Sequence, residues 1–434
     1  MKTFADYFFK STACYSDLIA VLDPENHASF TFEDLKTKTN SFVKALQEIG
    51  VQKKDRIGTF TGNSTEFLIF CLAANQIGAI LEFLRLIRKI YSEIQLSQDA
   101  DFVTLTNKDT VYGVLPFFHA GGFLTVFMML VQGAKVLINR KFDEDKFLEN
   151  IEKYQVTVLN LVPPILDFLT FSPKCDARKN LSSLRYIYVG AAPVRKELND
   201  IIFRKFWNVQ LIQLYGSTES GVLVFMTPKK SKFQEQLATK PGPCGLPLPG
   251  VQVKIAPLDG ENKDENYGEL LLKTTTEMKG YIKSSIDSST DPSIENPFDE
   301  DGFYRTGDLA RVDSDGFYYI VGRSKEMIKV RGWQVSPYEL EDALRQKFPQ
   351  IVEIGVVGIP EDKDGEQPSA IAVLAPGTML SAGEIETFVS ENFISYKRLT
   401  AGVHFLDSLP KTPSGKLDRL RLKQMLLEVS EFED

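Results

Sequence analysis

The chain has 434 residues, of which 43% are hydrophobic and 25% charged, the composition of a soluble globular protein with two or three domains. Its 50 basic and 58 acidic residues give a net charge of −8 without a dense basic run, which argues against nucleic acid or anionic lipid as a partner. Four cysteines without CxxC spacing argue against a disulfide framework, and three scattered histidines argue against a zinc site.

The sequence predicts a cytoplasmic protein without a signal peptide or a transmembrane segment. Charged residues interrupt the amino-terminal stretch, and the last four residues, "EFED", are not a peroxisomal signal. One uncharged run, Thr110–Ala134, is long enough to span a membrane, but proline and two glycines lie in its first half. We therefore expect a buried strand, a turn and then a core helix from about Phe123.

The first half of the chain alternates apolar strands with helical patterns. A helix is expected to start after Thr31, with Glu33 and Asp34 in its first turn. Later segments repeat the alternation: "AKVLINR", "DEDKFLENIEKYQ", "VTVLNLVP", "PPILDFLT", "LRYIYVG", "RKELNDIIFRKF" and "QLIQLYG". This order predicts an α/β fold with a mainly parallel sheet covered by helices on both faces. Two polar segments, "YVGAAPV" and "LYGSTES", then lie at carboxyl ends of strands, where ligands of such sheets bind.

From residue 240 onward the pattern changes. The turn-rich segment 240–250 introduces β-hairpins, and two Asp-Gly turns are each followed by Phe-Tyr. A smaller unit follows, whose first helix is predicted to carry a capping box of Ser336 and Glu339, with Pro337 at its first position. The prediction is a large N-terminal domain, 1–324, of mainly parallel sheets covered by helices plus β-hairpins. A small mobile C-terminal α+β domain, 325–434, completes the chain.

Each candidate functional residue has an ordinary alternative when it is taken singly. Asp308 in "TGD" could be a solvated carboxylate in a turn, or it could bind both hydroxyls of a ribose. Arg323 could be a surface charge or a second ribose contact, and Lys416 could belong to a flexible surface loop or be delivered to a phosphate. His119 and Tyr215 could equally be core residues, and the cations near residue 330 a solvated strand edge.

The order of the motifs favours the functional interpretation. The segments "PFFHAGG", "YVGAAPV", "QLYGSTESG", "YRTGDLA", "GRSKEMIKVRGWQVSPYELE" and "LPKTPSGKLDR" follow one another along the chain. Together they resemble the adenylate-forming superfamily of acyl-CoA synthetases, 4-coumarate–CoA ligases and beetle luciferases. The resemblance extends from about Thr31 to Met425.

This resemblance implies a nucleotide site with a defined set of residues. Thr218 would contact the α-phosphate and Glu219 would hold Mg²⁺, while Asp308 and Arg323 would bind the ribose. The nucleotide set as a whole would comprise Gly190, Ala191, Ala192, Gln213, Tyr215, Gly216, Thr218, Asp308, Arg323, Lys325, Gln334 and Lys416. Within it, Ala191, Ala192, Gln213 and Tyr215 would flank adenine.

The resemblance also implies a reaction in two steps. His119 would lie beside the acyl pocket, and Lys416 would neutralise the α-phosphoryl group as a carboxylate attacks and pyrophosphate leaves. The small domain would then rotate about Lys325 and bring Lys329, Arg331, Gly332 and Gln334 to the site. There coenzyme A would attack the acyl-adenylate, with Arg331 and Gly332 near the CoA.

One family feature is absent from the sequence. The Ser/Thr/Gly-rich loop ending in Pro-Lys-Gly, which grips the β- and γ-phosphates of ATP, has no counterpart before "PFFHAGG". The chain is shortened near residues 82–104, where Glu82–Gln95 reads as an amphipathic helix. Thr104, Thr106 and Lys108 offer hydroxyls and a cation but no glycine for a phosphate-binding nest.

Three functional hypotheses follow. The first is an ATP-dependent acid–CoA ligase that uses ATP, Mg²⁺ and coenzyme A to activate an aromatic or fatty carboxylic acid. The second is a catalytically impaired member, or an incomplete isoform, that binds AMP or an acyl-adenylate. The third is a luciferase-type oxygenase, which shares the motifs but has no positive support in the residues.

Overall fold

A computed structural model describes residues 3–79, 102, 105–176, 181–190, 196–206, 208–221, 223–228, 240, 242–258, 265–278, 280, 297–361, 365–412 and 416–430. The chain divides into two compact units. Unit 1 comprises Met1–Lys254, Leu271–Arg305 and Asp313–Tyr319, and unit 2 comprises Ile255–Leu270, Thr306–Val312 and Ile320–Asp434. The predicted helix at Glu82–Gln95 lies outside the described residues, as does the shortened segment near 82–104 apart from residue 102.

Unit 1 is built on a nine-stranded sheet with the order β2-β1-β4-β3-β5-β6-β7-β8-β9. The strands that form it are β1 (Ile19–Asp23), β2 (Ala28–Thr31), β3 (Thr110–Gly113), β4 (Lys135–Ile138), β5 (Val158–Leu161), β6 (Tyr186–Val189), β7 (Gln210–Tyr215), β8 (Phe225–Met226) and β9 (Leu246–Pro247). The pairs from β1–β4 through β6–β7 are parallel, and the outer pairs β1–β2, β7–β8 and β8–β9 are antiparallel. The predicted α/β class with a mainly parallel sheet is confirmed.

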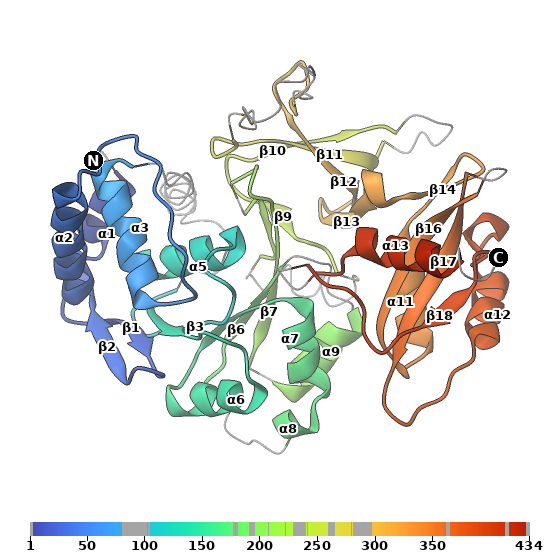
Figure 1. Cartoon of the computed structure of the whole chain (residues 1–434), viewed down its shortest axis with the longest axis horizontal. Helices are drawn as coiled ribbons and strands as arrows, with labels where there is room; N and C mark the ends of the chain where they lie inside the picture. Colours follow the sequence, from blue (N-terminus) through green and yellow to red (C-terminus); the bar gives the residue numbers. More distant parts are fainter. Residues whose placement is uncertain are drawn as a thin grey trace. The chain divides into compact units, whose positions relative to one another are not determined.

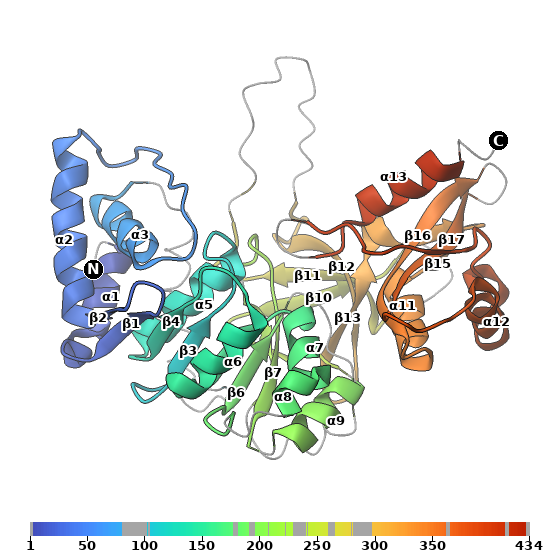
Figure 2. The ribbon, with the colours of Figure 1, turned by 60° about the horizontal axis from the view of Figure 1, so that its bottom comes forward.

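Helices cover both faces of this sheet because its central strands are apolar on both sides. Val111 of β3 packs in the core on one face and the neighbouring Tyr112 in the core on the other. The first core includes residues of α1 (Phe4–Ser11), α2 (Phe32–Glu48), α3 (Thr65–Ile77) and α5 (Ala120–Val131) (Figure 1). The second includes residues of α6 (Glu144–Lys153), α7 (Pro163–Phe171) and α9 (Lys196–Lys205), with the short α8 (Pro173–Asp176) beside them (Figure 2).

The uncharged run after Thr110 forms β3 and then α5, as expected. The helix begins at Ala120, three residues earlier than predicted, because the His119 side chain accepts a hydrogen bond from the Gly121 N–H and caps it. Within the described ranges, no helix combines the length and the apolar character that a bilayer crossing requires.

A four-stranded sheet with the order β10-β11-β12-β13 contains residues assigned to both units. Its strands are β10 (Gln252–Ala256), β11 (Tyr267–Lys273), β12 (Tyr304–Val312) and β13 (Tyr318–Arg323). The two predicted Asp-Gly turns are both present: Asp299 and Asp313 each accept backbone N–H groups two and four residues later through Oδ1. Lysines pair with both turns, Lys254 with the first and Lys240 with the second.

Unit 2 carries a second sheet with the order β15-β14-β17-β16, and β18 pairs with β17. Its elements are η2 (Ser324–Glu326), β14 (Ile328–Val330), β15 (Trp333–Val335), α11 (Pro337–Lys347), β16 (Ile351–Glu361), β17 (Gly365–Leu374), α12 (Ala382–Asn392), β18 (Val403–Phe405) and α13 (Arg419–Ser430). Leu340 and Leu344 of α11 and Ile385 and Val389 of α12 pack on one face of the sheet, and Leu422 of α13 packs with Ile371 on the other. This arrangement confirms the expected α+β unit.

The predictions for two helix starts have different outcomes. At Thr31, α2 begins at Phe32 as predicted, and a capping box with Asp34, which was not predicted, is present. At Ser336 the predicted capping box is wrong: the hydroxyl donates to the Val321 carbonyl, and Glu339 pairs with Lys397 at 2.6 Å. Contacts from distant parts of the chain occupy both groups, and Pro337 at the first helical position starts the helix without a side-chain cap.

The first turn of α5 lies so close to the preceding loop that only glycine fits at residue 122. A Cβ there would meet the Pro116 carbonyl oxygen at 2.2 Å. We predict that Gly122→Ala lowers the free energy of unfolding by about 1–3 kcal/mol, because the backbone has to shift. Gly383→Ala in the first turn of α12 is the control, since nothing lies within 4 Å of its Cβ, and it should be neutral or stabilising in urea unfolding. Equal effects of the two substitutions would contradict the steric explanation.

Candidate functional site

The two polar segments of the parallel sheet lie side by side. Val189 of β6 is opposite Gln213 of β7, so Gly190 follows β6 where β7 ends. A Cβ on Gly190 would lie 3.3 Å from the Leu214 carbonyl oxygen, which shows how closely the two segments approach. Ala191 and Ala192 lie outside the described residues. The tertiary structure therefore brings together Gly190, Gln213 and Tyr215, three of the predicted nucleotide residues.

The loop after β7 is held by its own serines. The Ser217 N–H donates to Ser220 Oγ at 3.0 Å, and the Ser220 N–H donates to Ser217 Oγ at 3.2 Å. The two hydroxyls are 3.1 Å apart. Gly221 takes a φ of +91°, a left-handed conformation that a residue with a side chain rarely adopts.

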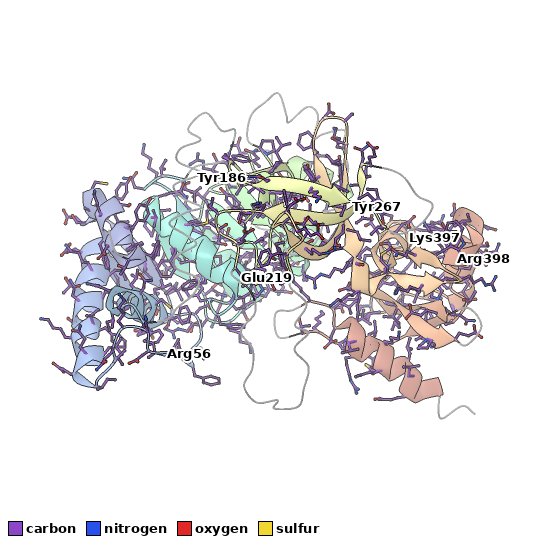
Figure 3. All side chains as sticks on the ribbon, turned by 90° about the horizontal axis from the view of Figure 1, so that it is seen from above. Arg56, Tyr186, Glu219, Tyr267, Lys397 and Arg398 are labelled. Atoms are coloured by element: carbon purple, nitrogen blue, oxygen red, sulfur yellow. The ribbon has the colours of Figure 1, made fainter. Side chains whose placement is uncertain are left out.

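Two threonines from a distant segment support the same loop. The hydroxyls of Thr274 and Thr276 both donate to the Ser220 carbonyl oxygen, at 3.3 and 3.2 Å. The Met278 N–H donates to the Glu219 carbonyl at 2.7 Å. Ser220 is fully buried, whereas Thr218 is exposed and the Glu219 side chain, labelled in Figure 3, is half-exposed. The loop backbone is thus fixed while the two predicted phosphate and metal residues face partly toward solvent.

His119 precedes α5, and its ring acts on the helix end. Its Nδ1 accepts the Gly121 N–H at 3.1 Å, so in the neutral ring the proton is on Nε2. The side chain is half-buried, unlike the neighbouring Phe117, which is buried, and Phe118, which is 64% exposed. His119 is therefore neither a fully enclosed core residue nor a free surface group.

Asn63 positions the segment that leads to His119. Its Nδ2 donates to the carbonyls of Leu115 and Asn139, each at 2.9 Å, and its Oδ1 accepts the Phe117 N–H at 2.6 Å. The residue is only 5% exposed. One buried amide thus joins the loop after β3 to the end of β4, and sequence reasoning did not identify it.

In unit 2 the predicted ribose residues contact each other. Arg323 Nε donates to Asp308 Oδ1 at 3.1 Å, with Asp308 largely buried and Arg323 59% exposed. The Thr306 hydroxyl accepts the Asp308 N–H and donates to the Leu270 carbonyl, which fixes the β12 backbone before the carboxylate. Hydrogen bonds of the neighbouring backbone thus position Asp308, and the ion pair joins it to Arg323.

Lys416 lies in the electrostatic environment of this pair. Desolvation by the surrounding protein lowers the pKa of the Lys416 ammonium, and the positive Arg323 lowers it further, while Asp308 and Glu326 oppose both effects. The side chain nevertheless remains exposed. Asp308, Arg323 and Lys416, far apart in the sequence, are therefore neighbours within unit 2.

The residues predicted for the second step form a hairpin. Lys329 of β14 is opposite Gln334 of β15, and Val330 is opposite Trp333. The two connecting residues, Arg331 and Gly332, have φ values of +48° and +84°, the pattern of a two-residue hairpin turn. The side chains of Lys329, Arg331 and Gln334 are exposed, as is Lys325 in η2.

Thr106 and Lys108 lie at the wrong end of β3 to form a phosphate cradle beside Gly190. The Thr106 hydroxyl and N–H both donate to the buried Asp109 carboxylate, at 3.2 and 2.9 Å. Asp109 also accepts the Thr157 hydroxyl and pairs with Arg185. These groups precede β3 and stabilise its amino end, opposite the edge where parallel strands present ligand sites. Thr104 lies outside the described residues.

Three or more His, Cys, Asp or Glu side chains do not come together as a metal cluster anywhere in the described part of the chain. A Mg²⁺ ion at the predicted position would be held by Glu219, with water and nucleotide phosphates as its other ligands. Magnesium is commonly held in this way, by one or two carboxylates and substrate phosphates.

Comparison with known proteins identifies the family. The sequence profile of the AMP-binding enzyme family matches residues 8–86 and 84–282, in two segments that meet at 84–86. The profile of the AMP-binding enzyme C-terminal domain matches residues 339–416. The chain belongs to the AMP-binding enzyme family. Its predicted resemblance to the adenylate-forming superfamily is confirmed.

A curated relative supports this family, and two solved structures share the fold. A probable 4-coumarate–CoA ligase 1 of Dictyostelium discoideum is 37% identical over 77% of this chain and 59% of its own length. The chain thus spans about three-fifths of the curated relatives it matches. The ATP-bound structure of MatB from Rhodopseudomonas palustris has a TM-score of 0.83 at 20% identity, covering 98% of this chain and 99% of that one. An o-succinylbenzoate CoA synthetase of Bacillus subtilis, solved with its acyl-adenylate intermediate, has a TM-score of 0.78 at 22% identity and covers 98% of each chain.

The hydroxyl contacts of the Ser217–Ser220 loop can be tested directly. We predict that Thr276→Val costs about 1 kcal/mol of stability, because one buried hydrogen bond to the Ser220 carbonyl is lost. Backbone amides of residues 217–221 should then exchange faster in hydrogen–deuterium exchange. Thr276→Ser keeps the hydroxyl and is the matched control. Identical exchange in the two variants would show that the Thr276 hydroxyl does not hold the loop.

Proposed function

We propose that this protein activates a carboxylic acid with ATP as an acyl-adenylate and transfers the acyl group to coenzyme A. The observation that carries the proposal is the neighbourhood of Asp308, Arg323 and Lys416 in unit 2. A buried carboxylate, a partly exposed guanidinium and an ammonium with a lowered pKa form a set suited to ribose hydroxyls and a phosphoryl group.

The proposal assigns the adenine and phosphate contacts to unit 1. Six residues of unit 1 would surround the adenine base: Gly190, Ala191, Ala192, Gln213, Tyr215 and Gly216. Thr218 would contact the α-phosphate. The exposure of Thr218 and the partial exposure of Glu219 support this assignment, because the loop backbone beside them is held in place. Glu219 would bind Mg²⁺, which supplies positive charge to the phosphates when bound.

In the first step, a carboxylate oxygen of the acid attacks the α-phosphorus and pyrophosphate leaves. Negative charge builds on the phosphoryl oxygens, and the Lys416 ammonium would neutralise it. Partial desolvation favours this role, since a less hydrated cation interacts more strongly with a developing anion. His119 would border the acyl group with its Nε2–H, because Nδ1 is occupied by the helix cap.

In the second step, the thiol of coenzyme A attacks the acyl carbon and AMP leaves. The exposed hairpin of Lys329, Arg331, Gly332 and Gln334 would serve this step after rotation about Lys325, with 1–324 and 325–434 as the two functional domains. The hairpin supports the assignment because its turn is formed by backbone conformation and leaves its cationic side chains exposed. The apolar sequence around His119, "PFFHAGGF", favours an aromatic or fatty acid, and an aromatic acid also fits the relatives' names.

A second candidate function is supported by the sequence segment before His119. The Ser/Thr/Gly-rich phosphate loop is absent, and the two matched segments of the family profile meet at 84–86. Under this alternative the protein binds AMP or an acyl-adenylate but forms the adenylate poorly, because no backbone cradle holds the β- and γ-phosphates. Such a protein would act as a binder, or would be an incomplete isoform.

Carboxylate-dependent ATP–pyrophosphate exchange tests the proposal against this alternative. With a panel of aromatic and fatty acids, we expect exchange by the wild-type chain and a loss of about a hundredfold or more in Lys416→Ala. Lys411→Ala, in the same loop, is the control and should retain exchange. Binding of a non-hydrolysable acyl-adenylate analogue without exchange of any acid would favour the second candidate. Undiminished exchange in Lys416→Ala would contradict the mechanism.

The lowered pKa of Lys416 makes a separate prediction about pH. Because the ammonium is the active form, exchange should fall as pH rises through the lysine pKa, and this fall should begin at lower pH than for an ordinary lysine. Lys416→Arg should be slower but should lose this alkaline limb, since a guanidinium stays charged. The measurement is the pH profile of kcat for exchange, from neutrality to about pH 10. An identical alkaline limb in both proteins would assign the titration to another group.

A further inference from the structure

Arg419, three residues after Lys416, forms a partly buried ionic cluster. Its Nε donates to Glu326 Oε2 at 3.1 Å, and its terminal nitrogens donate to both oxygens of Glu341, one of them at 2.9 Å. A further bond of 3.0 Å joins Nη1 to the Val356 carbonyl. The guanidinium also stacks on the Tyr338 ring, with 4.5 Å between its carbon and the ring centroid. One residue at the start of α13 therefore contacts η2, α11 and β16 together.

The two carboxylates of this cluster differ in what surrounds them. Glu341 is enclosed: its residue exposure is 6%, and its Oε1 also accepts the Val356 N–H at 2.7 Å. Glu326 is half-buried, accepts the Tyr338 hydroxyl at 2.8 Å and directly follows Lys325. It is also one of the charges that act on Lys416, together with Arg323 and Asp308. Glu326 thus acts electrostatically on three cations, Arg419, Arg323 and Lys416.

The backbone around Lys416 is anchored independently of Glu326. Lys411 pairs with Leu417 in an antiparallel bridge, and the Thr412 N–H donates to the Lys416 carbonyl at 2.8 Å. Lys411 also pairs with Glu353 through a 2.7 Å contact. The loop backbone is therefore held by these contacts, whereas the long Lys416 side chain can change its conformation in response to nearby charges.

We propose that Arg419 is a positioning residue for the first step: by binding Glu326 it prevents this carboxylate from capturing the Lys416 ammonium. The inference rests on the proposed role of Lys416. With the guanidinium in place, Glu326 already has a cationic hydrogen-bond partner, so Lys416 gains less by turning toward it. Without that partner, Glu326 and Lys416 form an ion pair of their own, and the ammonium is withdrawn from the phosphoryl group.

The geometry requires arginine at this position. A planar guanidinium with five N–H groups can bind two carboxylates and a carbonyl at once, whereas an ammonium is a compact point charge. In Arg419→Lys the ammonium pairs with Glu341, because that carboxylate is more deeply buried and would otherwise lie unpaired. Glu326 then loses its charged partner while the enclosed pair survives. Arg419→Lys therefore tests the proposed effect on Lys416 while keeping the ion pair with Glu341, whose loss would destabilise unit 2.

The test is a double-mutant cycle of Arg419→Lys and Glu326→Gln, with folding checked by thermal unfolding. In Arg419→Lys, acid-dependent ATP–pyrophosphate exchange should fall between about tenfold and a hundredfold, the cost of misplacing a group near the reaction. Thioester formation from a supplied acyl-adenylate should be unchanged, because Lys416 does not act in that step. Adding Glu326→Gln should restore exchange, since the competing charge is gone. Glu326→Gln alone should remain close to wild type.

A second readout does not depend on activity. The rate at which an amine-reactive ester acylates Lys416, followed by mass spectrometry across pH, reports the pKa of that ammonium. Arg419→Lys should move the profile to higher pH, because Glu326 then stabilises the charged form, and the double variant should return it. If wild type shows no exchange, the proposed function fails while this measurement still decides the role of Arg419.

Two outcomes would overturn the inference. Failure of Glu326→Gln to rescue folded Arg419→Lys, in exchange and in the reactivity profile alike, would leave Arg419 with a structural role only. Lys411→Gln removes a different anchor of the same loop and leaves Glu326 paired. An equal loss of exchange in that control would show that loop anchoring in general, and not the Glu326 charge, controls Lys416.

Discussion

The parallel hydrogen-bonded register of β6 and β7 is the constraint on which the candidate site of unit 1 depends. Because Val189 lies opposite Gln213, the segment that starts at Gly190 and the loop that starts at Gly216 leave the same edge of the sheet. A shift by one residue would invert the faces of Tyr188 and Ile212, which are buried in the core. Core packing and the position of the polar loops are therefore set by one interaction.

Polar side chains then fix loops that the sheet only brings close together. Asn63 satisfies the backbone before His119, and Thr274 and Thr276 satisfy the Ser220 carbonyl beside Glu219. Buried backbone groups cost free energy when they lack partners, so each contact stabilises one loop conformation over its alternatives. In these loops, His119, Thr218 and Glu219 remain partly exposed, whereas the side chains that support the loops are buried. A rigid backbone can thus present accessible hydroxyl and carboxylate groups.

In unit 2, ion pairs between charged side chains fix the arrangement of the candidate residues. Asp308 and Arg323 pair at the sheet, and Arg419 with Glu341 forms an enclosed pair next to Glu326. A buried ion pair contributes little net stability, but it is costly to break, so it maintains a unique arrangement of charges. In the proposed mechanism this arrangement matters because Lys416 must carry a positive charge near several acidic groups without being bound by them. In the β14–β15 hairpin, the side chains of Lys329, Arg331 and Gln334 are exposed.

Features that depend on neighbours in the sequence were predictable from the sequence itself. The strand–helix alternation, the Asp-Gly turns and the start of α2 after Thr31 all follow from periodicity or from contacts within four residues. The ordered motifs also identified the family and the candidate residues. Only the tertiary structure decided that Ser336 donates to Val321, that Asn63 holds the loop before His119, and that Arg419 joins Glu326 to Glu341. These contacts join residues far apart in the chain, and no local pattern specifies which partner a buried polar group meets when the chain closes.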